Sequence, residues 1–302
     1  VLELKQACYS ATGGLQLAKA LIAQDPSKKV LLIAADIARY GLNTTGESSQ
    51  GAGAIAMIIS QNPRVLSLDD ASGVYTEEVM DFWRPNYRTE ALVDGKFSCD
   101  VYLSCLQKSY ARYVNDFKEK NNTDIKLDNF EAICFHVPVP KLAKNGLTKL
   151  LRSFSDLNTE SKALLKSNLD ASLHFGANTG NSYTAALYVS LLSLFCHGKK
   201  DFAGKRIGFY SYGSGSVSEF FSGVVQDGYK FAINMASIQS MLENRSALSV
   251  PQYEQYFKFK LPTDGGELKL PRLSKGRFRL ASVNQHKRFY VKDPACQTHV
   301  TT

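Results

Sequence analysis

Two nearly continuous apolar runs constrain the fold of this chain more than any other feature. The first covers residues 29–37 (KVLLIAADI) and the second covers residues 52–60 (AGAIAMIIS), and polar residues bound both. Apolar runs of this length without strict alternation are typical of strands that are covered on both faces. We therefore expect a layered α/β fold in which helices pack on both sides of these strands.

Strand and helix patterns then repeat in the same coarse order along the chain. Short apolar strands are expected at residues 2–5, 64–68, 132–136, 206–212 and 216–225, with an aromatic and basic strand pair near 278–290. Residues 69–100 are polar and irregular, so we expect an extended surface loop there. Helical periodicity predicts helices over residues 15–22, 102–117, 147–154, 159–169, 182–196, 232–243 and 251–257. The repeated order is compatible with a duplicated fold.

Composition excludes several classes of function. No apolar run approaches the ~18 residues that cross a bilayer, and the first residues lack the pattern of a secretory signal. The 302 residues carry a net charge of +8, but the basic residues are scattered and no recognition module accompanies them. We therefore expect neither a membrane nor a nucleic acid as partner. A positive field of this kind favours substrates that carry phosphate groups.

The six cysteines occur at positions 8, 99, 105, 134, 196 and 296 without any Cys-x-x-Cys pair. This spacing is unlike a disulfide scaffold, so we expect reduced thiols in a cytoplasmic protein. No histidine, cysteine and carboxylate spacing resembles a zinc site. The Gly51-Ala52-Gly53 segment enters a strand and does not join a strand to a helix, which argues against a nicotinamide cofactor. We expect no metal and no cofactor.

Cys8 is placed where a strand-like segment turns into a helical pattern. At the amino end of a helix, free backbone N–H groups and the helix dipole stabilise a thiolate and lower the pKa of the thiol. This position predicts a nucleophile. A buried, inert cysteine is the alternative that position alone leaves open.

Two further segments offer groups that could take part in catalysis. His136 ends a short apolar strand and precedes Val137-Pro138, which directs the backbone away from the sheet. The imidazole is therefore expected to point into a cleft, although a structural histidine is the alternative. Gly213, Ser214 and Gly215 form a tight turn whose N–H groups could make an oxyanion hole, and a plain hairpin turn is equally compatible.

Eight short segments are spread over nearly the whole chain. They are, in order, residues 5–12 (KQACYSAT), 34–40 (AADIARY), 50–54 (QGAGA), 81–85 (DFWRP), 93–95 (VDG), 135–138 (FHVP), 180–184 (GNSYT) and 211–215 (SYGSG). In this order and register they resemble the hydroxymethylglutaryl-CoA (HMG-CoA) synthases. The DFWRP segment is more similar to the enzymes of the mevalonate pathway than to the synthases that place β-branches on polyketides.

The resemblance implies a thiolase-like duplicated αβαβα fold, an acyltransferase activity and a homodimer. It divides the chain into three parts. Residues 1–68 are the rest of an amino-terminal half with the nucleophile, and residues 69–130 are an excursion and helical region. Residues 131–302 are the carboxy-terminal half, with the histidine and the asparagine. The implied reaction condenses acetyl-CoA with acetoacetyl-CoA to HMG-CoA, with coenzyme A thioesters as substrates and no separate cofactor.

The resemblance also implies roles for individual residues. Cys8 matches the cysteine that carries the acetyl group, and His136 matches the histidine that orients and polarises the acetoacetyl ketone. Tyr40 and Asn181 match side chains of the acyl pocket, and the N–H of Ser214, which follows Gly213, matches the oxyanion hole together with that of Cys8. Two lysines beyond His136 are candidate contacts for coenzyme A phosphates, namely Lys141 and Lys144.

One departure from the family pattern concerns the general acid/base. The family places this glutamate a few dozen residues before the nucleophile, whereas the sequence starts seven residues before Cys8. Glu3 lies on the segment that leads into the nucleophile and cannot replace it. We expect these residues to be part of a longer protein, and we expect the 302 residues alone to be poorly stable and unable to form the carbon–carbon bond. A polyketide synthase that uses carrier-protein substrates and a non-catalytic subunit that binds coenzyme A esters are the alternatives.

Overall fold

The computed structural model describes residues 1–88, 90–154, 157–272 and 276–292. Its internal contacts divide into two units, Val1–Glu243 and Asn244–Thr302. The first unit contains every segment on which a catalytic role was predicted, so its architecture positions the candidate site. The predicted three-part division at residues 68 and 130 stays a prediction.

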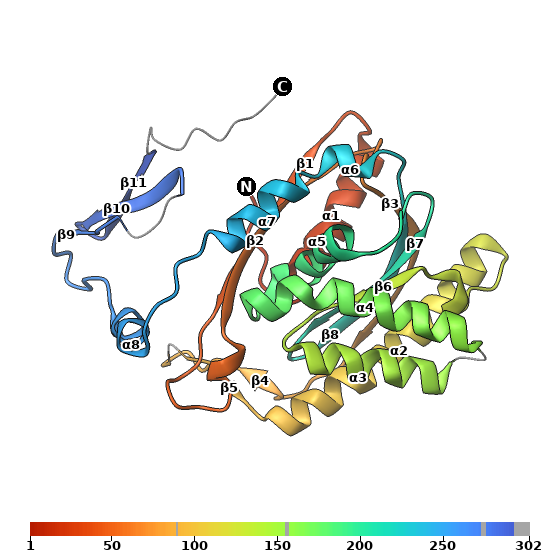
Figure 1. Ribbon diagram of the computed structural model, residues 1–302, viewed down its shortest axis with the longest axis horizontal. Coiled ribbons are helices and arrows are strands. Elements are labelled where there is room, and N and C mark those ends of the chain that lie inside the picture. Colours follow the sequence, from red (N-terminus) through yellow and green to blue (C-terminus); the bar gives the residue numbers. More distant parts are fainter. Residues whose placement is uncertain (89, 155–156, 273–275, 293–302) are drawn as a thin grey trace. The chain divides into compact units, whose positions relative to one another are not determined.

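A four-stranded mixed sheet lies at the centre of the first unit (Figure 1). The strand order is β3-β8-β7-β6, in which β6 is parallel to β7 and the other pairs are antiparallel. Both faces are covered, since nearly every residue of β6, β7 and β8 is buried. The bounds are β3 (Leu66–Thr76), β6 (Ala132–Phe135), β7 (Arg206–Gly213) and β8 (Val217–Val225).

Helices cover one face of this sheet. The inward side chains of Ile133, Tyr210 and Phe220 pack there against apolar residues of the helices. Asp94 caps the long helix α2 by accepting a hydrogen bond from the Phe97 N–H, which is the role of an aspartate at a helix start. The helices are α2 (Gly95–Asn121), α3 (Pro140–Ser153) and α4 (Thr159–Thr179), and a short turn, η2 (Leu127–Asn129), precedes β6.

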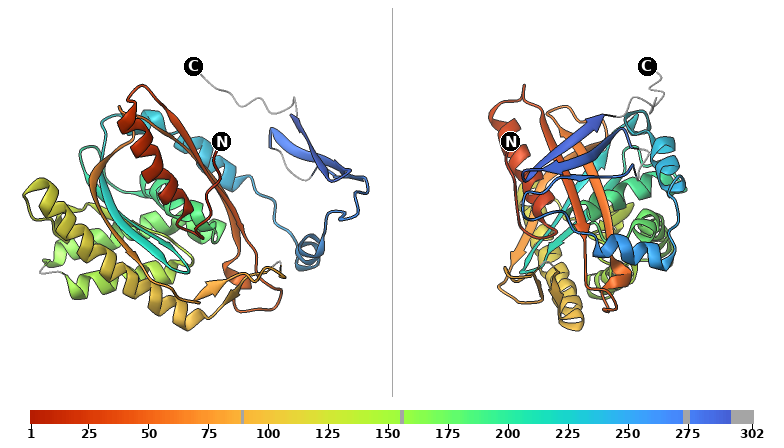
Figure 2. Two further views of the ribbon diagram at one scale, coloured as in Figure 1. Left: turned by 180° about the vertical axis from the view of Figure 1, so that it is seen from behind. Right: turned by 90° about the vertical axis from the view of Figure 1, so that its left-hand side faces the viewer.

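The opposite face of the sheet packs against two more helices and then a second pair of strands (Figure 2). Phe209 and Phe221 lie on this face in a core shared with Leu15 and Leu187. Successive layers are therefore helices, sheet, helices and strands, in agreement with the layered α/β prediction. The elements are α1 (Ser10–Gln24), α5 (Ala186–His197), β1 (Val30–Ala38) and β2 (Gly51–Ile59), with turns η1 (Glu47–Ser49) and η3 (Tyr183–Ala185).

Coverage of the β1–β2 pair differs from the prediction. The two apolar runs do form this antiparallel pair, with Ala34 opposite Ile55. Only the inner face is covered within the part of the chain that the structure describes, and alternate side chains of the outer face are exposed. These include Leu31 (61% exposed), Ile33 (61%), Ile37 (72%) and Ile58 (68%).

Two predicted boundaries were wrong. Residues 2–5 do not form a strand, and only a single bridge between Gln6 and Cys8 precedes α1. The expected loop over residues 69–100 contains most of β3, a small hairpin of β4 (Phe82–Trp83) and β5 (Leu92–Val93), and the start of α2. Asp69 makes β3 look polar in sequence, but its carboxylate pairs with Arg206 on β7.

The chain after β8 forms short elements. Helices α6 (Tyr229–Ala232) and α7 (Met235–Glu243) complete the first unit. The second unit holds α8 (Val250–Lys258), which starts with a capping box of Ser249 and Gln252, and a sheet of order β11-β10-β9. These strands are β9 (Leu268–Lys269), β10 (Phe278–Asn284) and β11 (Lys287–Lys292), so the predicted strand pair is present.

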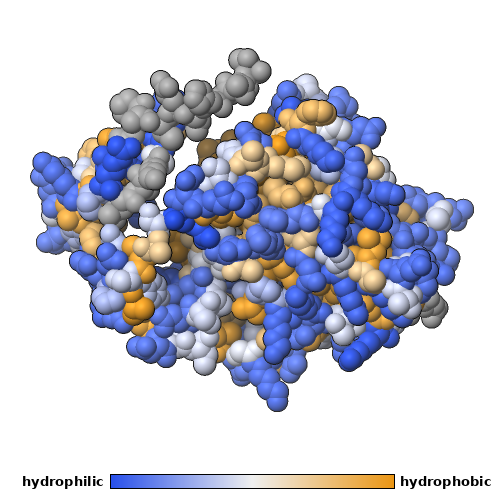
Figure 3. All heavy atoms as spheres, in the orientation of Figure 1, coloured by the Kyte–Doolittle hydropathy of each residue, from blue (hydrophilic) through white to orange (hydrophobic). Residues whose placement is uncertain are grey.

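Hydrophilic side chains lie between smaller groups of apolar ones on the face that Figure 3 shows. None of the helices in the described ranges combines the length and the apolar character that a bilayer crossing requires.

Candidate active site

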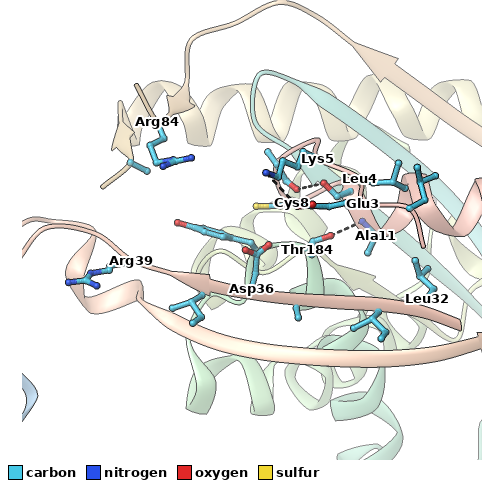
Figure 4. Close-up of a pocket in the computed structure, with 18 of the residues that line it drawn as sticks. Glu3, Leu4, Lys5, Cys8, Ala11, Leu32, Asp36, Arg39, Arg84 and Thr184 are labelled. Atoms are coloured by element: carbon cyan, nitrogen blue, oxygen red, sulfur yellow. Dashed lines mark hydrogen bonds and ion pairs between the residues drawn. The ribbon is translucent and has the colours of Figure 1, made fainter. Parts of the chain in front are cut away.

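Cys8 lies just before the amino-terminal end of α1 and lines a large open cavity of the first unit (Figure 4). The thiol is 8% exposed, and the cavity has a volume of about 1160 Å³. Its lining combines apolar residues of the amino-terminal segment and of β1 with polar, charged and aromatic side chains. Those that line it with Cys8 include Lys5, Asp36, Arg39, Phe82, Trp83, Arg84, Tyr183 and Thr184.

Distant parts of the chain fix the first turn of α1. The Ala11 N–H, which no residue of the helix itself can satisfy, donates to Thr184 Oγ1 at 2.7 Å. Thr12 Oγ1 donates to Ser211 Oγ on β7 at 2.8 Å. Ala7, directly before the nucleophile, has a φ of 45°, a conformation that is strained for any residue with a Cβ. The turn that presents Cys8 is therefore held by tertiary contacts.

The glycine turn after β7 packs directly on this segment. A Cβ at Gly213 would lie 2.6 Å from the Gln6 carbonyl oxygen and 2.8 Å from the Tyr9 nitrogen, so only glycine fits. Residues 214–216 connect β7 to β8 as a hairpin, which is the plain structural reading of the motif. Its position against the Cys8 segment also suits the predicted oxyanion hole, and the role of the Ser214 N–H stays a prediction.

A buried aspartate that the sequence did not single out as functional holds this turn. Asp81 is 0% exposed and accepts hydrogen bonds from the Tyr212 hydroxyl at 2.7 Å and the Gly215 N–H at 3.0 Å. Ser98 Oγ, from the start of α2, also donates to it at 2.9 Å. Asp81 belongs to the DFWRP segment, so the signal was present in the motif, but its partners are known only from the fold.

Tyr40 and Asn181 meet in the structure although 141 residues separate them. Both side chains are buried, and Asn181 Nδ2 donates to the Tyr40 hydroxyl at 3.5 Å. The Asn181 backbone N–H donates to the Ser49 carbonyl, which anchors the end of α4 beside β2. The Tyr40 ring centroid lies 6.0 Å from that of Phe82 and 6.4 Å from that of Tyr183. These aromatic rings form one wall next to the nucleophile.

His136 directly follows β6, as predicted, and its imidazole is buried at 2% exposure. The backbone N–H of His136 donates to the Tyr210 carbonyl on β7, and the backbone carbonyl of His136 accepts from the Tyr102 hydroxyl at 2.9 Å. Nδ1 is buried and has no hydrogen-bond partner among the described residues. Tyr210 is close to the last residue of β7, Gly213, which packs on the Cys8 segment, so His136 and Cys8 both lie towards this end of β7.

The open cavity does not contain every predicted residue. Among the described residues, His136, Tyr40 and Asn181 do not line it, although the Tyr40 ring packs against the lining residues Phe82 and Tyr183. Lys141 and Lys144 lie exposed on the first turns of α3, also outside the lining, and Lys144 Nζ pairs with Asp170 at 2.7 Å. The basic residues at the cavity, which the sequence analysis missed, are Lys5, Arg39 and Arg84.

The electrostatics of Cys8 contradict one expectation. Burial raises the pKa of the Cys8 thiol, and the carboxylates of Asp36 and Asp81 raise it further. A backbone hydrogen bond at Cys8 lowers the pKa, as the helix position predicted, but the opposing effects outweigh it. The resting nucleophile is therefore a neutral thiol. It must lose its proton as it attacks.

The raised pKa predicts how alkylation of Cys8 depends on pH. Below the pKa of a thiol, its thiolate fraction grows about tenfold for each pH unit. The rate of Cys8 modification by iodoacetamide should therefore keep rising from pH 7 to pH 10 without a plateau, measured by mass spectrometry of the Cys8 peptide. Asp36→Asn removes one carboxylate and should make modification faster at each pH. A plateau at neutral pH in the unmodified protein would contradict this account.

Burial also lowers the pKa of His136 to about 3, so its imidazole is neutral at physiological pH. In the unfolded chain the histidine binds a proton near its ordinary pKa of 6.5. The unfolded state then binds more protons between these values, and stability falls as the pH drops below about 6.5. This stabilisation is complete above that pH.

The resulting prediction compares the protein with a His136→Asn variant. The difference in the free energy of unfolding between pH 7 and pH 5 should be about 2 kcal/mol larger in the unmodified protein, since each pH unit contributes about 1.4 kcal/mol. Urea unfolding at both pH values measures it. Equal pH dependence of the two proteins would show that the histidine titrates normally in the folded state.

The remaining candidates give no second site. Cys99, Cys105, Cys134 and Cys196 are free thiols, and Cys296 lies outside the described residues. Within the described ranges, histidine, cysteine and carboxylate side chains nowhere gather in a group of three that could hold a metal ion.

Comparison with known proteins identifies what this architecture is similar to. The family model described as hydroxymethylglutaryl-coenzyme A synthase C terminal matches residues 66–164 and 156–291. The model described as 3-oxoacyl-[acyl-carrier-protein] synthase III matches residues 2–71. The two models together cover most of the chain and meet in β3.

Individual relatives agree with the family models. The chain is 37% identical over 288 residues to a hydroxymethylglutaryl-CoA synthase of Enterococcus faecalis, covering 95% of this chain and 72% of that protein. It is 33% identical over 270 residues to a polyketide biosynthesis 3-hydroxy-3-methylglutaryl-ACP synthase of Bacillus subtilis, covering 85% of this chain and 63% of that protein.

Solved structures show the same two kinds of neighbour. An HMG-CoA synthase complexed with CoA superimposes with a TM-score of 0.88 at 38% identity, covering 97% of this chain and 73% of that chain. The HMG synthase of the curacin biosynthetic pathway, in complex with apo donor-ACP, superimposes with a TM-score of 0.86 at 32% identity, covering 97% of this chain and 74% of that chain.

Proposed function

The chain belongs to the hydroxymethylglutaryl-CoA synthase family, and we propose that the full-length protein condenses acetyl-CoA with acetoacetyl-CoA to HMG-CoA through an acetyl group carried on Cys8. The family has a thiolase-like fold and consists of acyl-condensing enzymes that act on coenzyme A thioesters. One observation carries the proposal. A cysteine at the start of a helix lines a large cavity, and a glycine turn from a distant part of the sequence packs on the neighbouring backbone of Gln6 and Tyr9.

The first step transfers the acetyl group to the protein. Cys8 Sγ attacks the thioester carbonyl of acetyl-CoA, the bond from that carbon to the coenzyme A sulfur breaks, and coenzyme A leaves as a thiol with the proton that Cys8 loses. The oxyanion that forms transiently accepts hydrogen bonds from the Cys8 and Ser214 N–H groups. The close fit of Gly213 on the Cys8 segment supports this pairing of donors.

The second step forms the carbon–carbon bond. The glutamate base that the family resemblance implies takes a proton from the acetyl methyl, and the resulting carbanion attacks the ketone carbon of acetoacetyl-CoA. The protonated base then returns the proton to the alkoxide, which gives the tertiary alcohol. The neutral imidazole of His136 donates a hydrogen bond to the developing alkoxide, which suits a histidine whose pKa is far below neutral. Water then hydrolyses the thioester to Cys8 and releases HMG-CoA. Tyr40 and Asn181 bound the acyl pocket during both steps.

The finer parts of the proposal rest on sequence. The DFWRP segment supports free coenzyme A esters and a place in the mevalonate pathway. Cysteine usage supports a cytoplasmic enzyme, and the family resemblance supports a homodimer. We place the nucleophile in residues 1–68 and His136 and Asn181 in residues 131–302, with residues 69–130 between them.

A second candidate is a synthase that takes its substrates from an acyl carrier protein. Its support is the similarity to the Bacillus subtilis 3-hydroxy-3-methylglutaryl-ACP synthase and to the curacin pathway synthase with donor-ACP. The same nucleophile and histidine would serve both reactions, since only the carrier of the acyl group differs.

The test offers the full-length protein both kinds of substrate. Acetyl-CoA is supplied with acetoacetyl-CoA or with an acetoacetyl carrier protein, and the condensed product is measured by mass spectrometry. We expect product from the free coenzyme A pair. Product only with the carrier protein would establish the second candidate, and no acylation of Cys8 with either donor would indicate a non-catalytic subunit.

A further inference from the structure

A buried glutamate lies on the strand that follows the glycine turn. Glu219 is the third residue of β8, and it is 0% exposed. Burial raises the pKa of its carboxyl group. A buried carboxyl group is unfavourable unless hydrogen bonds satisfy it, so its partners indicate what it does.

Both principal partners of Glu219 come from the nucleophile's helix. The Tyr9 hydroxyl donates to Oε2 at 2.7 Å, and Gln16 Nε2 donates to Oε1 at 2.5 Å. These partners are 210 and 203 residues away in the sequence. Tyr9 directly follows Cys8 and is the residue from which α1 starts. A contact that fixes the Tyr9 ring therefore fixes the turn that carries the nucleophile.

The backbone of Tyr9 is held by the neighbouring strand. A Cβ at Gly213 would lie 2.8 Å from both the nitrogen and the Cβ of Tyr9. In the β7–β8 ladder Ser211 is opposite Glu219, and Ser211 Oγ accepts from Thr12 Oγ1 one turn further along α1. The two strands that hold α1 are thus the strands joined by the turn that contains Ser214.

We propose that Glu219 is a positioning residue for the nucleophile. Through the Tyr9 hydroxyl it fixes the Cys8 backbone against the Gly213–Ser214 turn, so that Cys8 Sγ and the N–H donors keep the separation that attack on a thioester requires. The role rests on the proposed function, because it matters only if Cys8 accepts an acyl group. A misplacement of about 1 Å is enough to slow such a reaction roughly 100-fold.

The test uses substitutions in the full-length protein that separate position from stability. Glu219→Gln keeps the shape and an acceptor oxygen, whereas Glu219→Met keeps the length without hydrogen bonds. Tyr9→Phe removes the hydroxyl alone, and a double variant, Tyr9→Phe with Glu219→Met, removes both partners. The readouts are the single-turnover rate of Cys8 labelling by radiolabelled acetyl-CoA, the KM for acetyl-CoA and the melting temperature.

A matched control lies on the same strand. Ser222 is 0% exposed and hydrogen-bonds to Tyr113 and Asp69, neither of which belongs to the nucleophile's helix. Ser222→Ala should lower the melting temperature without slowing the labelling of Cys8.

We expect Glu219→Gln to label within about threefold of the unmodified protein, and each of Glu219→Met and Tyr9→Phe to label roughly 10- to 100-fold more slowly with little change in KM. In the double variant the melting temperature should rise above that of Glu219→Met, because the Tyr9 hydroxyl that lost its acceptor is gone and only Gln16 still lacks its partner. Labelling should stay as slow as in the slower single variant.

Labelling that recovers together with the melting temperature in the double variant would overturn the proposal, since Glu219 would then act on stability alone. Normal labelling of Glu219→Met would overturn it as well. An unmodified protein that takes no label at all would instead disprove the proposed function.

Discussion

Replacing Cys8 by alanine is expected to lower the rate of HMG-CoA formation by roughly 10⁴-fold or more, because the acetyl group then has no covalent carrier. The thiol lines the cavity at the start of α1, and Cys196, by contrast, lies on α5 and outside the described lining. A coupled assay of coenzyme A release with both substrates measures the rate.

Two variants make this result specific. Cys196→Ala removes another free thiol and should leave the rate unchanged. Cys8→Ser keeps the size of the side chain but replaces the thiol with a hydroxyl, which is a weaker nucleophile without a dedicated base, and should be nearly as slow as Cys8→Ala. Condensation by Cys8→Ala at more than a few per cent of the normal rate would show that another group carries the acetyl.

Replacing His136 by leucine should lower the condensation rate about 100- to 1000-fold while Cys8 still accepts acetyl from acetyl-CoA. The reason is that a neutral, buried imidazole can donate a hydrogen bond to the alkoxide formed from the ketone, and removing one such donor typically has an effect of this size. In the proposed mechanism, acetylation uses the N–H groups at Cys8 and Ser214 and does not need the imidazole.

His136→Asn is the matched control, because its amide restores a donor in a smaller volume. It should recover part of the condensation rate lost in His136→Leu. Single-turnover labelling by acetyl-CoA and product formation with acetoacetyl-CoA separate the two steps. If His136→Leu slowed acetylation as much as condensation, the imidazole would act on the nucleophile and the assigned role would be wrong.

Much of the fold was predictable because its signals are local. The runs at residues 29–37 and 52–60 became β1 and β2, and the strand before His136 became β6. Motifs in register also identified the family correctly. Only the start of β3 was predicted, because Asp69 looked like a surface residue, and the Arg206 that pairs with it lies 137 residues further along the chain.

The chemistry of the candidate site was harder to predict from the sequence than the identity of its residues. The turn before α1 could be located at Cys8, but the direction of the shift in its pKa could not, because burial and the carboxylates of Asp36 and Asp81 come from the tertiary fold. Glu219 gave no signal in the sequence for the same reason. Its proposed role depends on a hydrogen bond from the Tyr9 hydroxyl, and Tyr9 is 210 residues away in the sequence.

Locating the acetyl group on the protein tests the central claim most directly. The full-length protein is mixed with acetyl-CoA, quenched in acid before hydrolysis, digested and mapped by mass spectrometry. The account predicts one acetylated peptide, with the acetyl group on the sulfur of Cys8. An acetyl group on any other residue, or an unmodified Cys8 peptide at full substrate saturation, would contradict it.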